Sequence, residues 1–264
     1  MDGPRSKASH SLRFALCLLG ALLLSGCFVG GTGAGSRSSG PSASNSSSAP
    51  ADPVTVTDYK GDFSLGADGG LTASETLTAS FPAGRHGIFR FFDTQTRAAP
   101  SARLAPAVTG ATLDGAATPV SFSWENDNRY LVAKVGDPNT VLSPGSHVFV
   151  ISYTIPNAIF PATAASGSYQ STAGTNTAPA KSVFYWNVVA PGWQMPIEKA
   201  SSRIHLPTPS GQVQCTAGAM TPTKQGPCAI VGAGTPEVTV GARNIPPVSG
   251  MTVRVSMATT PPTG

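Results

Sequence analysis

Four residues in one short stretch of the sequence could form a charged site: Glu75, His86, Gly87 and Arg90. Glu75 is in line with apolar residues on one side of the alternating run at 71–81. Because a buried carboxylate is costly unless it is paired, we predict a Glu75–Arg90 ion pair that holds the second segment against the first. A binding role for this pair is the alternative. His86 lies between two arginines, so it could form an anion site or simply occupy a turn.

Three residues further along the chain could bind a sugar: Trp186, Asn187 and Trp193. Exposed aromatic rings suit carbohydrate because they offer apolar faces, and an amide both donates and accepts hydrogen bonds. We therefore treat these residues as a candidate ligand surface. Packing of the two tryptophans in a hydrophobic core is the competing interpretation and the more common situation.

The sequence contains no familiar catalytic motif. After residue 26 the histidines are His86, His147 and His205, and serines are abundant, so a Ser/His/Asp combination is available by chance. However, G-x-S-x-G, H-E-x-x-H and a phosphate-binding glycine loop are all missing. We therefore predict that the protein is not an enzyme and that it has no cofactor and no metal site.

The four cysteines fall into separate regions of the sequence. Cys17 lies in the N-terminal leader, residues 1–26, and Cys27 follows it, which leaves Cys215 and Cys228 as an even pair. In an exported domain such a pair favours a disulfide, which would close a loop of about 13 residues and contribute about 3 kcal/mol in the chain-entropy model. Metal binding is the alternative, but two cysteines without a nearby histidine make a poor zinc site.

Residues 1–26 have the features of a signal peptide. Three basic residues precede an apolar run at 14–24, which is too short to cross a bilayer core of ~30 Å comfortably. The run leads into LSGC at 24–27, which resembles the lipobox of bacterial lipoproteins. We therefore expect cleavage before Cys27 and lipid attachment to it, by two or more acyl chains of the palmitate kind. An ordinary secretory signal with an incidental cysteine is the alternative.

The composition divides the remaining chain into a tether, one domain and a tail. Residues 30–48 are almost only Gly, Ser, Ala, Thr and Pro, so we expect 27–53 to form a flexible tether that reaches about 25–30 Å. We interpret 54–258 as the domain and 259–264 as a disordered tail. The formal net charge is only +4 and no basic run with interleaved aromatics occurs, which argues against nucleic-acid binding.

Residues 54–258 contain short alternating segments separated by turn residues. The clearest are 54–65, 71–81, 148–155 and 120–135, the last of which should form a hairpin. Shorter segments follow at 183–189, 203–206, 212–216, 237–241 and 251–257. Many short strands with regular turns predict an all-β fold, an antiparallel β-sandwich that is immunoglobulin-like or related. The segment 161–180, rich in Ala, Ser, Thr and Gly, is expected to be a disordered loop.

Several of these motifs, taken in order, resemble one known family. An Asp-Gly turn, a strand with a central glutamate and HGIFR at 86–90 are similar to the extracytoplasmic N-terminal domain of the DUF2207 family, bacterial membrane proteins of unknown function. The resemblance covers about 54–257. It continues through VFVISYTI at 148–155, FYWNVV at 184–189, then Trp193, PIE at 196–198 and IHLP at 204–207. In that family the domain usually continues into transmembrane helices and a cytoplasmic tail, whereas this sequence ends at Gly264.

The leader and the resemblance together imply a bacterial, in particular actinobacterial, lipoprotein on the extracytoplasmic face of the cell membrane. We expect an interaction or sensing module that is held to the membrane by its lipid and binds another envelope protein or a cell-wall glycan. A hydrolase or transferase acting on envelope polymers is the alternative, and a purely structural lipoprotein is a third. A pocket with His86, a carboxylate and an exposed serine would favour the enzyme, whereas a flat sheet edge or an exposed apolar patch would favour the binding module.

Overall fold

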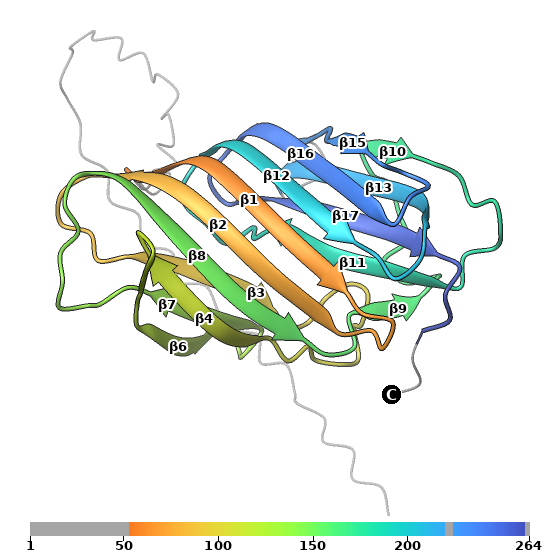
Figure 1. Ribbon diagram of the computed structural model, residues 1–264, viewed down its shortest axis with the longest axis horizontal. Coiled ribbons are helices and arrows are strands. Elements are labelled where there is room, and N and C mark those ends of the chain that lie inside the picture. Colours follow the sequence, from red (N-terminus) through yellow and green to blue (C-terminus); the bar gives the residue numbers. More distant parts are fainter. Residues whose placement is uncertain (1–52, 220–223, 262–264) are drawn as a thin grey trace, which may run out of the picture. The chain divides into compact units, whose positions relative to one another are not determined.

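The structure, a computed structural model, describes residues 53–219 and 224–261. The predictions for the leader, the tether and Cys27 concern residues outside this part. The described residues form no α-helix, and their strands are arranged in three sheets. Figure 1 shows the largest sheet in front and the other two behind it. The predicted all-β sandwich is therefore confirmed.

The eight-stranded sheet forms the first layer. All of its neighbouring strands pair antiparallel except β1 and β12, which lie parallel. Parallel pairing requires a long crossover, and the chain supplies one by building most of the second layer between these two strands. The order across the sheet is β15 (Ala229–Val231), β16 (Glu237–Ile245), β12 (Ile197–His205), β1 (Thr55–Leu65), β2 (Leu71–Phe81), β8 (Gly145–Ile155), β4 (Ala107–Leu113) and β5 (Ala116–Ala117).

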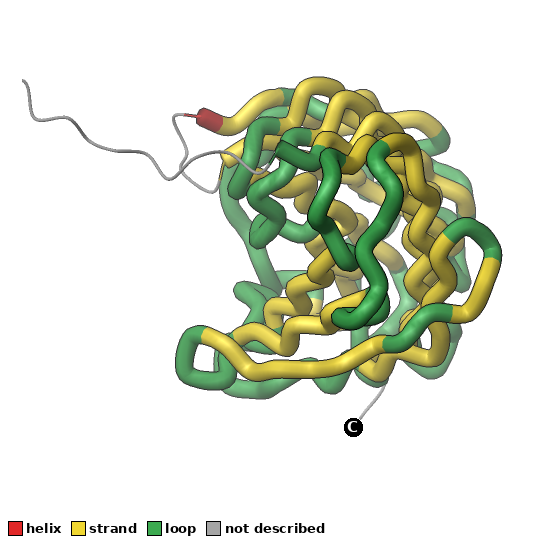
Figure 2. Tube along the Cα trace, turned by 90° about the vertical axis from the view of Figure 1, so that its left-hand side faces the viewer, coloured by secondary structure: helices red, strands yellow, loops and turns green. Residues whose placement is uncertain are grey.

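The other two sheets form the second layer. One contains β10 (Ser171–Ala173), β13 (Ser210–Ala219), β17 (Ser249–Met257), β11 (Ser182–Val189) and β9 (Ile159–Pro161), with β14 (Gln225–Gly226) paired to β13. The three-stranded sheet has the order β3 (Ile88–Asp93), β7 (Tyr130–Val135) and β6 (Val120–Glu125). The predicted hairpin at 120–135 is thus confirmed as β6 and β7. Figure 2 turns the molecule by 90°, which brings the loops at one end of the strands to the front.

Alternation of apolar and polar side chains explains why these segments are strands. In β2 the residues predicted to face the core are buried, whereas the intervening Thr and Ser residues are partly or fully exposed. β8 has the same pattern, with Phe149, Ile151, Tyr153 and Ile155 all buried. Each of these strands therefore offers one apolar face to the core and one face rich in hydroxyl groups to solvent.

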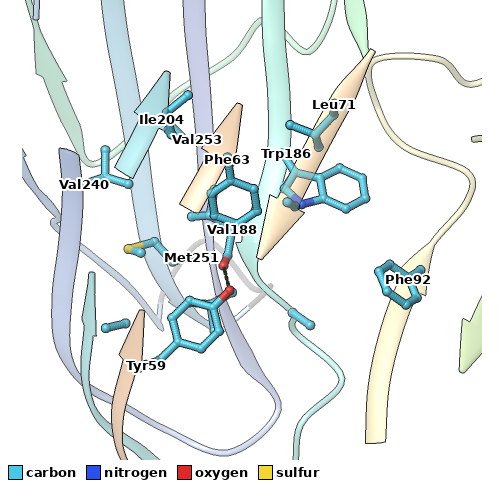
Figure 3. Packing of buried hydrophobic residues seen from close by; sticks show 14 of the residues in the cluster. Tyr59, Phe63, Leu71, Phe92, Trp186, Val188, Ile204, Val240, Met251 and Val253 are labelled. Carbon is cyan, nitrogen blue, oxygen red and sulfur yellow. Dashed lines mark hydrogen bonds between the residues drawn. The ribbon is translucent and has the colours of Figure 1, made fainter. Parts of the chain in front are cut away.

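The hydrophobic core lies between the two layers. Figure 3 shows Phe63 of the large sheet close to Trp186 and Met251 of the second layer. Burying a large apolar side chain completely stabilises the fold by about 1.5–3 kcal/mol. One hydrogen bond also joins the layers, because the Tyr59 hydroxyl on β1 donates to the Val188 carbonyl on β11 over 2.5 Å.

The segment 161–180 is not disordered, so this prediction was wrong. Its strand β10 pairs with β13, and the Gln170 backbone N–H donates to Thr216 Oγ1 over 3.0 Å. Arg254 of β17 donates through Nε to the Ala164 carbonyl, also over 3.0 Å. The composition misled because the segment is ordered by hydrogen bonds to β13 and β17 rather than by apolar side chains of its own.

Candidate functional site

The predicted Glu75–Arg90 ion pair is present, and it lies in the interior. Arg90 Nη2 is 2.6 Å from Glu75 Oε1, and Arg90 Nε is 2.7 Å from Glu75 Oε2. The carboxylate side chain is 0 % exposed and the guanidinium side chain 1 %. Two parallel N–H···O bonds of this kind match the planar geometries of both groups. Because Glu75 belongs to β2 and Arg90 to β3, the pair joins the eight-stranded sheet to the three-stranded sheet.

The Tyr153 hydroxyl completes this buried network. It donates to Glu75 Oε1 over 2.6 Å and accepts from Arg90 Nη2 over 3.3 Å. It also accepts from Trp186 Nε1 over 3.2 Å. One phenol therefore links β8, β2, β3 and β11. The sequence did contain a signal for this role, since Tyr153 is in phase with buried apolar residues and a buried hydroxyl requires partners.

The remaining surroundings of Arg90 also stabilise its charge. Its guanidinium lies over the Phe92 ring, with Cζ 4.6 Å from the ring centre, and its Nη1 donates to the Phe91 carbonyl. Burial alone would lower the pKa of Arg90, but the carboxylate of Glu75 and the neighbouring phenols outweigh burial and raise it. For the Tyr153 hydroxyl burial acts in the opposite direction and raises the pKa, because it disfavours the charged phenolate. The guanidinium is thus permanently charged and satisfied, which identifies the network as a structural link between the sheets.

The candidate ligand surface at Trp186, Asn187 and Trp193 was wrong for both tryptophans. Their exposed fractions are 4 % and 2 %, so neither ring can stack on a ligand. Trp193 Nε1 donates to the Phe89 carbonyl and its ring packs edge-on against Tyr59, with 5.8 Å between the ring centres. Asn187 accepts a hydrogen bond from Thr252 Oγ1 over 2.7 Å. Core packing, the competing interpretation, describes the two tryptophans.

His86 and Gly87 lie apart from the buried pair, in the turn before β3. His86 Nδ1 donates to the Thr140 carbonyl over 3.0 Å, and its ring is exposed. Gly87 has a φ of 157°, and a Cβ on it would stand 2.0 Å from the Val135 carbonyl oxygen. Only glycine therefore permits this close approach of the turn to the end of β7.

Two shallow depressions flank the half-exposed ring of Phe89. The first, of about 290 Å³, is lined by residues that include Arg85, His86, Ser121 and Lys134. The second, of about 280 Å³, is bordered by the loop that contains Trp193. His86 and Ser121 thus lie beside one depression, but the described residues place no carboxylate in hydrogen-bonding contact with His86. This neighbourhood offers cations, the Glu125 carboxylate in the second depression and an aromatic ring, but no bonded catalytic set.

Within the described ranges, the edge strand β6 carries the most exposed Phe and Trp side chains, and neither was among the candidate residues predicted from the sequence. Phe122 and Trp124 are each 52 % exposed and lie on the same side of the strand. Their register places them in line with Arg90 and Phe92, two strands away. The alternation that first identified this hairpin was the available signal, because it repeats large aromatic residues at every second position.

A second histidine, His147, makes two hydrogen bonds to acceptors. Its Nδ1 is 2.7 Å from Asp114 Oδ2 and its Nε2 is 2.8 Å from the Ser143 carbonyl oxygen. Since a carboxylate and a carbonyl only accept, both ring nitrogens donate when the imidazole is protonated. These bonds raise the pKa of His147, chiefly through Asp114. Backbone and side-chain hydrogen bonds from Val148 and His147 lower the pKa of Asp114.

The predicted disulfide is confirmed. Cys215 and Cys228 are bonded, with 5.8 Å between their Cα atoms. Cys215 belongs to β13 of the second layer, and Cys228 directly precedes β15 at the edge of the first layer. The bond therefore links the two layers at this end of the sandwich.

A comparison with protein families identifies the domain. The profile of the family described as "Predicted membrane protein (DUF2207) N-terminal domain" matches residues 55–257. The chain belongs to the DUF2207 family. The resemblance noted from the sequence motifs is thereby confirmed, and the family description makes this a relative of predicted membrane proteins. Curated proteins yielded no match. The described part of this DUF2207 chain has no helix long and apolar enough to cross a membrane, and no cluster of three or more potential metal ligands.

Among solved structures the DUF2207 domain shows a distant likeness to a hydrolase and to a zinc metallopeptidase. Yeast LTA4 hydrolase in complex with bestatin has 10 % identity and a TM-score of 0.44, over 76 % of this chain and 28 % of that one. The M1 zinc metallopeptidase from Deinococcus radiodurans has 16 % identity and a TM-score of 0.38, over 77 % of this chain and 43 % of that one. This chain thus spans less than half the length of these structures. At these values the likeness carries no inference about activity.

Proposed function

We propose that this DUF2207 domain is a binding module of the cell envelope that takes up an extended segment of another envelope protein along the free edge of β6. In this proposal lipid on Cys27 holds the chain at the extracytoplasmic face of the membrane. Strand addition of this kind uses backbone hydrogen bonds for affinity and alternate side chains for specificity.

The state of the sheet edges supports β6 as the binding edge. Six strands end the three sheets, and four of them, β15, β5, β10 and β9, are only two or three residues long. Short edge strands are one way in which proteins prevent unwanted pairing. β3 has six residues, but the Trp193 side chain donates to its Phe89 carbonyl and Gly192 packs against Phe91. Among the described residues β6 makes no backbone pairing except with β7.

The side chains of β6 also suit a protein partner. The strand contains no Pro and no Lys, the residues that commonly protect an edge. Phe122 and Trp124 present exposed aromatic area, which is characteristic of the residues that dominate binding energy at protein interfaces. An exposed apolar patch beside an open sheet edge is the feature that we expected of a binding module rather than of an enzyme.

Charge favours a different protein over a second copy of this chain. Glu125 and Asp127 at the turn end of β6 are exposed and have no ion-pair partner among the described residues. An antiparallel second copy would bring residues 116–121 to this end, and that stretch, AATPVS, contains no basic residue. A partner segment with Lys or Arg there would satisfy both carboxylates.

Site-specific photo-crosslinking in native membranes tests this proposal. A photoreactive residue at Ser121 of the full chain should form an adduct with one envelope protein. Phe122→Ser with Trp124→Ser should abolish that adduct without changing the melting temperature. Val231→Ser, which removes another exposed apolar side chain, on β15 of the eight-stranded sheet, is the matched control and should preserve it. An adduct between two differently tagged copies, or an adduct that survives the double substitution, would overturn the proposed partner.

The anchoring part of the proposal has a separate test. Cys27→Ala should prevent incorporation of a fatty-acid probe and should leave uncleaved precursor or released protein. Label that persists on the variant would exclude Cys27 as the lipid site.

The enzymatic alternative has less support. His86 and Ser121 border the same depression, but His86 Nδ1 donates to the Thr140 carbonyl, and no carboxylate of the described residues hydrogen-bonds to His86. A nucleophile, a base and an orienting group in mutual contact are the geometry that such a reaction requires.

A further inference from the structure

The outer face of the eight-stranded sheet, which is turned toward the viewer in Figure 1, carries a shallow trough formed by two adjoining hollows. One hollow of about 560 Å³ lies over β15, β16 and β12, and a second of about 390 Å³ lies over β16, β12, β1 and β2. The two hollows share Lys199, Ser201 and Thr239, so they form one continuous depression. We propose that this trough binds an anionic polysaccharide.

The strand register explains why the trough exists. Ala229, Gly241, Ser201, Lys60 and Thr76 lie side by side on five neighbouring strands. Three of these residues, on β15, β16 and β12, are small and form a low floor. At about 4.8 Å between strands, the row spans about 19 Å. This length suits an extended polymer rather than a single sugar.

Longer and charged side chains border the low row. On one side Arg243 of β16 lies opposite Lys199 of β12. On the other side Arg203 of β12 lies opposite Asp62 of β1. The register therefore creates a channel across the strands with cationic groups on both sides.

The charge of the lining favours an anion. Four cations line the trough, Lys60, Lys199, Arg203 and Arg243, against a single carboxylate, Asp62. Lys60 and Lys199 contact Asp58, whose side chain is 26 % exposed, at 3.1 and 3.6 Å, and Arg203 contacts Glu237 at 3.5 Å in a pair that is more than half exposed. An exposed pair contributes about 0–1 kcal/mol, so Arg203 can exchange its partner for a ligand group at little cost.

Arg243 is the best-placed cation for a ligand. It is exposed, and its side chain has no ion-pair or hydrogen-bond partner in the described part of the chain. A guanidinium can bind a carboxylate or phosphate with two parallel hydrogen bonds. Acidic groups along a polysaccharide could therefore bind the unpaired guanidinium of Arg243 and the exposed guanidinium of Arg203, with the amines of Lys60 and Lys199 beside them.

The hydroxyl groups in the trough favour a sugar polymer over other polyanions. Ser74, Thr76, Ser201 and Thr239 line it, and none of their side chains makes a hydrogen bond within the described residues. Each hydroxyl can both donate to and accept from a sugar hydroxyl. The lining contains no aromatic ring, and such rings are the stacking platforms that single-stranded nucleic acids require.

The experiment is a titration of the detergent-solubilised full chain with polygalacturonate oligomers of defined length, with neutral dextran and linear polyphosphate as comparisons. Polygalacturonate should bind, more weakly as salt rises, and dextran should not. Arg243→Glu should weaken binding about tenfold or more, and Arg243→Gln less, because only the former adds repulsion. Lys181→Glu makes the same charge change at an exposed position outside the trough and should change affinity by less than about twofold.

The isosteric variant Thr76→Val separates a glycan site from simple ion exchange. It should weaken polygalacturonate binding more than polyphosphate binding, because a sugar hydroxyl can both donate to and accept from the threonine hydroxyl, whereas phosphate oxygens only accept. Failure of polygalacturonate to bind the unmodified chain would overturn the proposal. Equal losses in Arg243→Glu and Lys181→Glu, or polyphosphate binding that matches polygalacturonate with no effect of Thr76→Val, would overturn it too. The β6 crosslinking result is independent of all of these outcomes.

Discussion

Tyr153 and Glu75 meet diagonally on neighbouring strands, where the phenol donates to the carboxylate over 2.6 Å. The same carboxylate accepts both hydrogen bonds of the Arg90 fork. Removing one partner of a buried ion pair is strongly destabilising because it leaves an uncompensated charge. In this network the charges are paired and hydrogen-bonded by residues from three strands, β2, β3 and β8. The network therefore constrains where the three-stranded sheet docks on the eight-stranded sheet.

The first prediction concerns this docking. Glu75→Ala and Arg90→Ala should each cost about 3–5 kcal/mol of unfolding free energy, because each leaves one buried charge without its partner. The double variant should lose clearly less than the sum, since the second change removes the charge that was left unpaired. Denaturant unfolding of the full chain measures all three values.

A surface pair provides the control for this cycle. Arg203 and Glu237 lie 3.5 Å apart but are both largely exposed, so either alanine substitution should cost less than about 1 kcal/mol. Additive losses at Glu75 and Arg90 would contradict the role that we assign to the buried pair.

The second prediction compares two buried phenols. Tyr153→Phe deprives Glu75 of a donor and both Trp186 and Arg90 of an acceptor, so it should cost about 1–3 kcal/mol. Tyr59→Phe removes the 2.5 Å bond to the Val188 carbonyl, a single backbone acceptor, and should cost about 1 kcal/mol. Urea unfolding of the two variants measures this difference. If Tyr59→Phe lowered the unfolding free energy as much as Tyr153→Phe or more, the Tyr153 hydroxyl would not be the more important of the two for stability.

The sequence allowed the strands and the buried pair to be predicted, because both follow from local alternation. Glu75 interrupts an apolar face, and that single irregularity indicated a partner. Tyr153 and Trp186 could not be assigned to the same network, since their meeting depends on how β8 and β11 lie across the core. Trp193 could have been either a ligand surface or core until the loop around it was placed.

The surface features were harder to predict for a related reason. The trough on the large sheet depends on the register of β16 and β12 against β1 and β2, and these two pairs of strands are distant from each other in the sequence. Similarly, β6 becomes an open edge only because the hairpin that it forms with β7 pairs with β3 rather than with the large sheet.

The third prediction concerns pH. The raised pKa of His147 means that its contribution to stability is fully present below the unfolded value of about 6.5 and is lost as pH rises through the folded pKa. The lowered pKa of Asp114 means that its contribution is present above its ordinary pKa and is lost as pH falls through the folded value. The pair should therefore stabilise most between these two transitions.

Melting temperatures of the full chain and of His147→Gln, measured from pH 4 to 9, test this expectation. The difference in melting temperature between the two proteins should be largest at mildly acidic pH and should shrink as pH rises. The corresponding change in unfolding free energy should be no more than about 1 kcal/mol, because Asp114 is partly exposed. His205→Gln is the control, since its contacts with carboxylates are 3.5 Å long and exposed. A difference that does not vary with pH would mean that the His147 charge has no part in stability.

The fourth prediction concerns the disulfide. Cys215 and Cys228 should resist alkylation until the protein is reduced. Removing the bond by the double Cys→Ala substitution should cost about 3 kcal/mol in the chain-entropy model, and chemical reduction of the natural chain should cost a similar amount. Because Cys228 directly precedes β15 and lines the first hollow, loss of the bond should also loosen the end of the trough. Polygalacturonate binding should therefore weaken on reduction, whereas crosslinking from Ser121 on β6 should persist. Free thiols in the oxidised protein would refute the bond itself, and equal loss of both binding functions would indicate general unfolding instead of a local effect at β15.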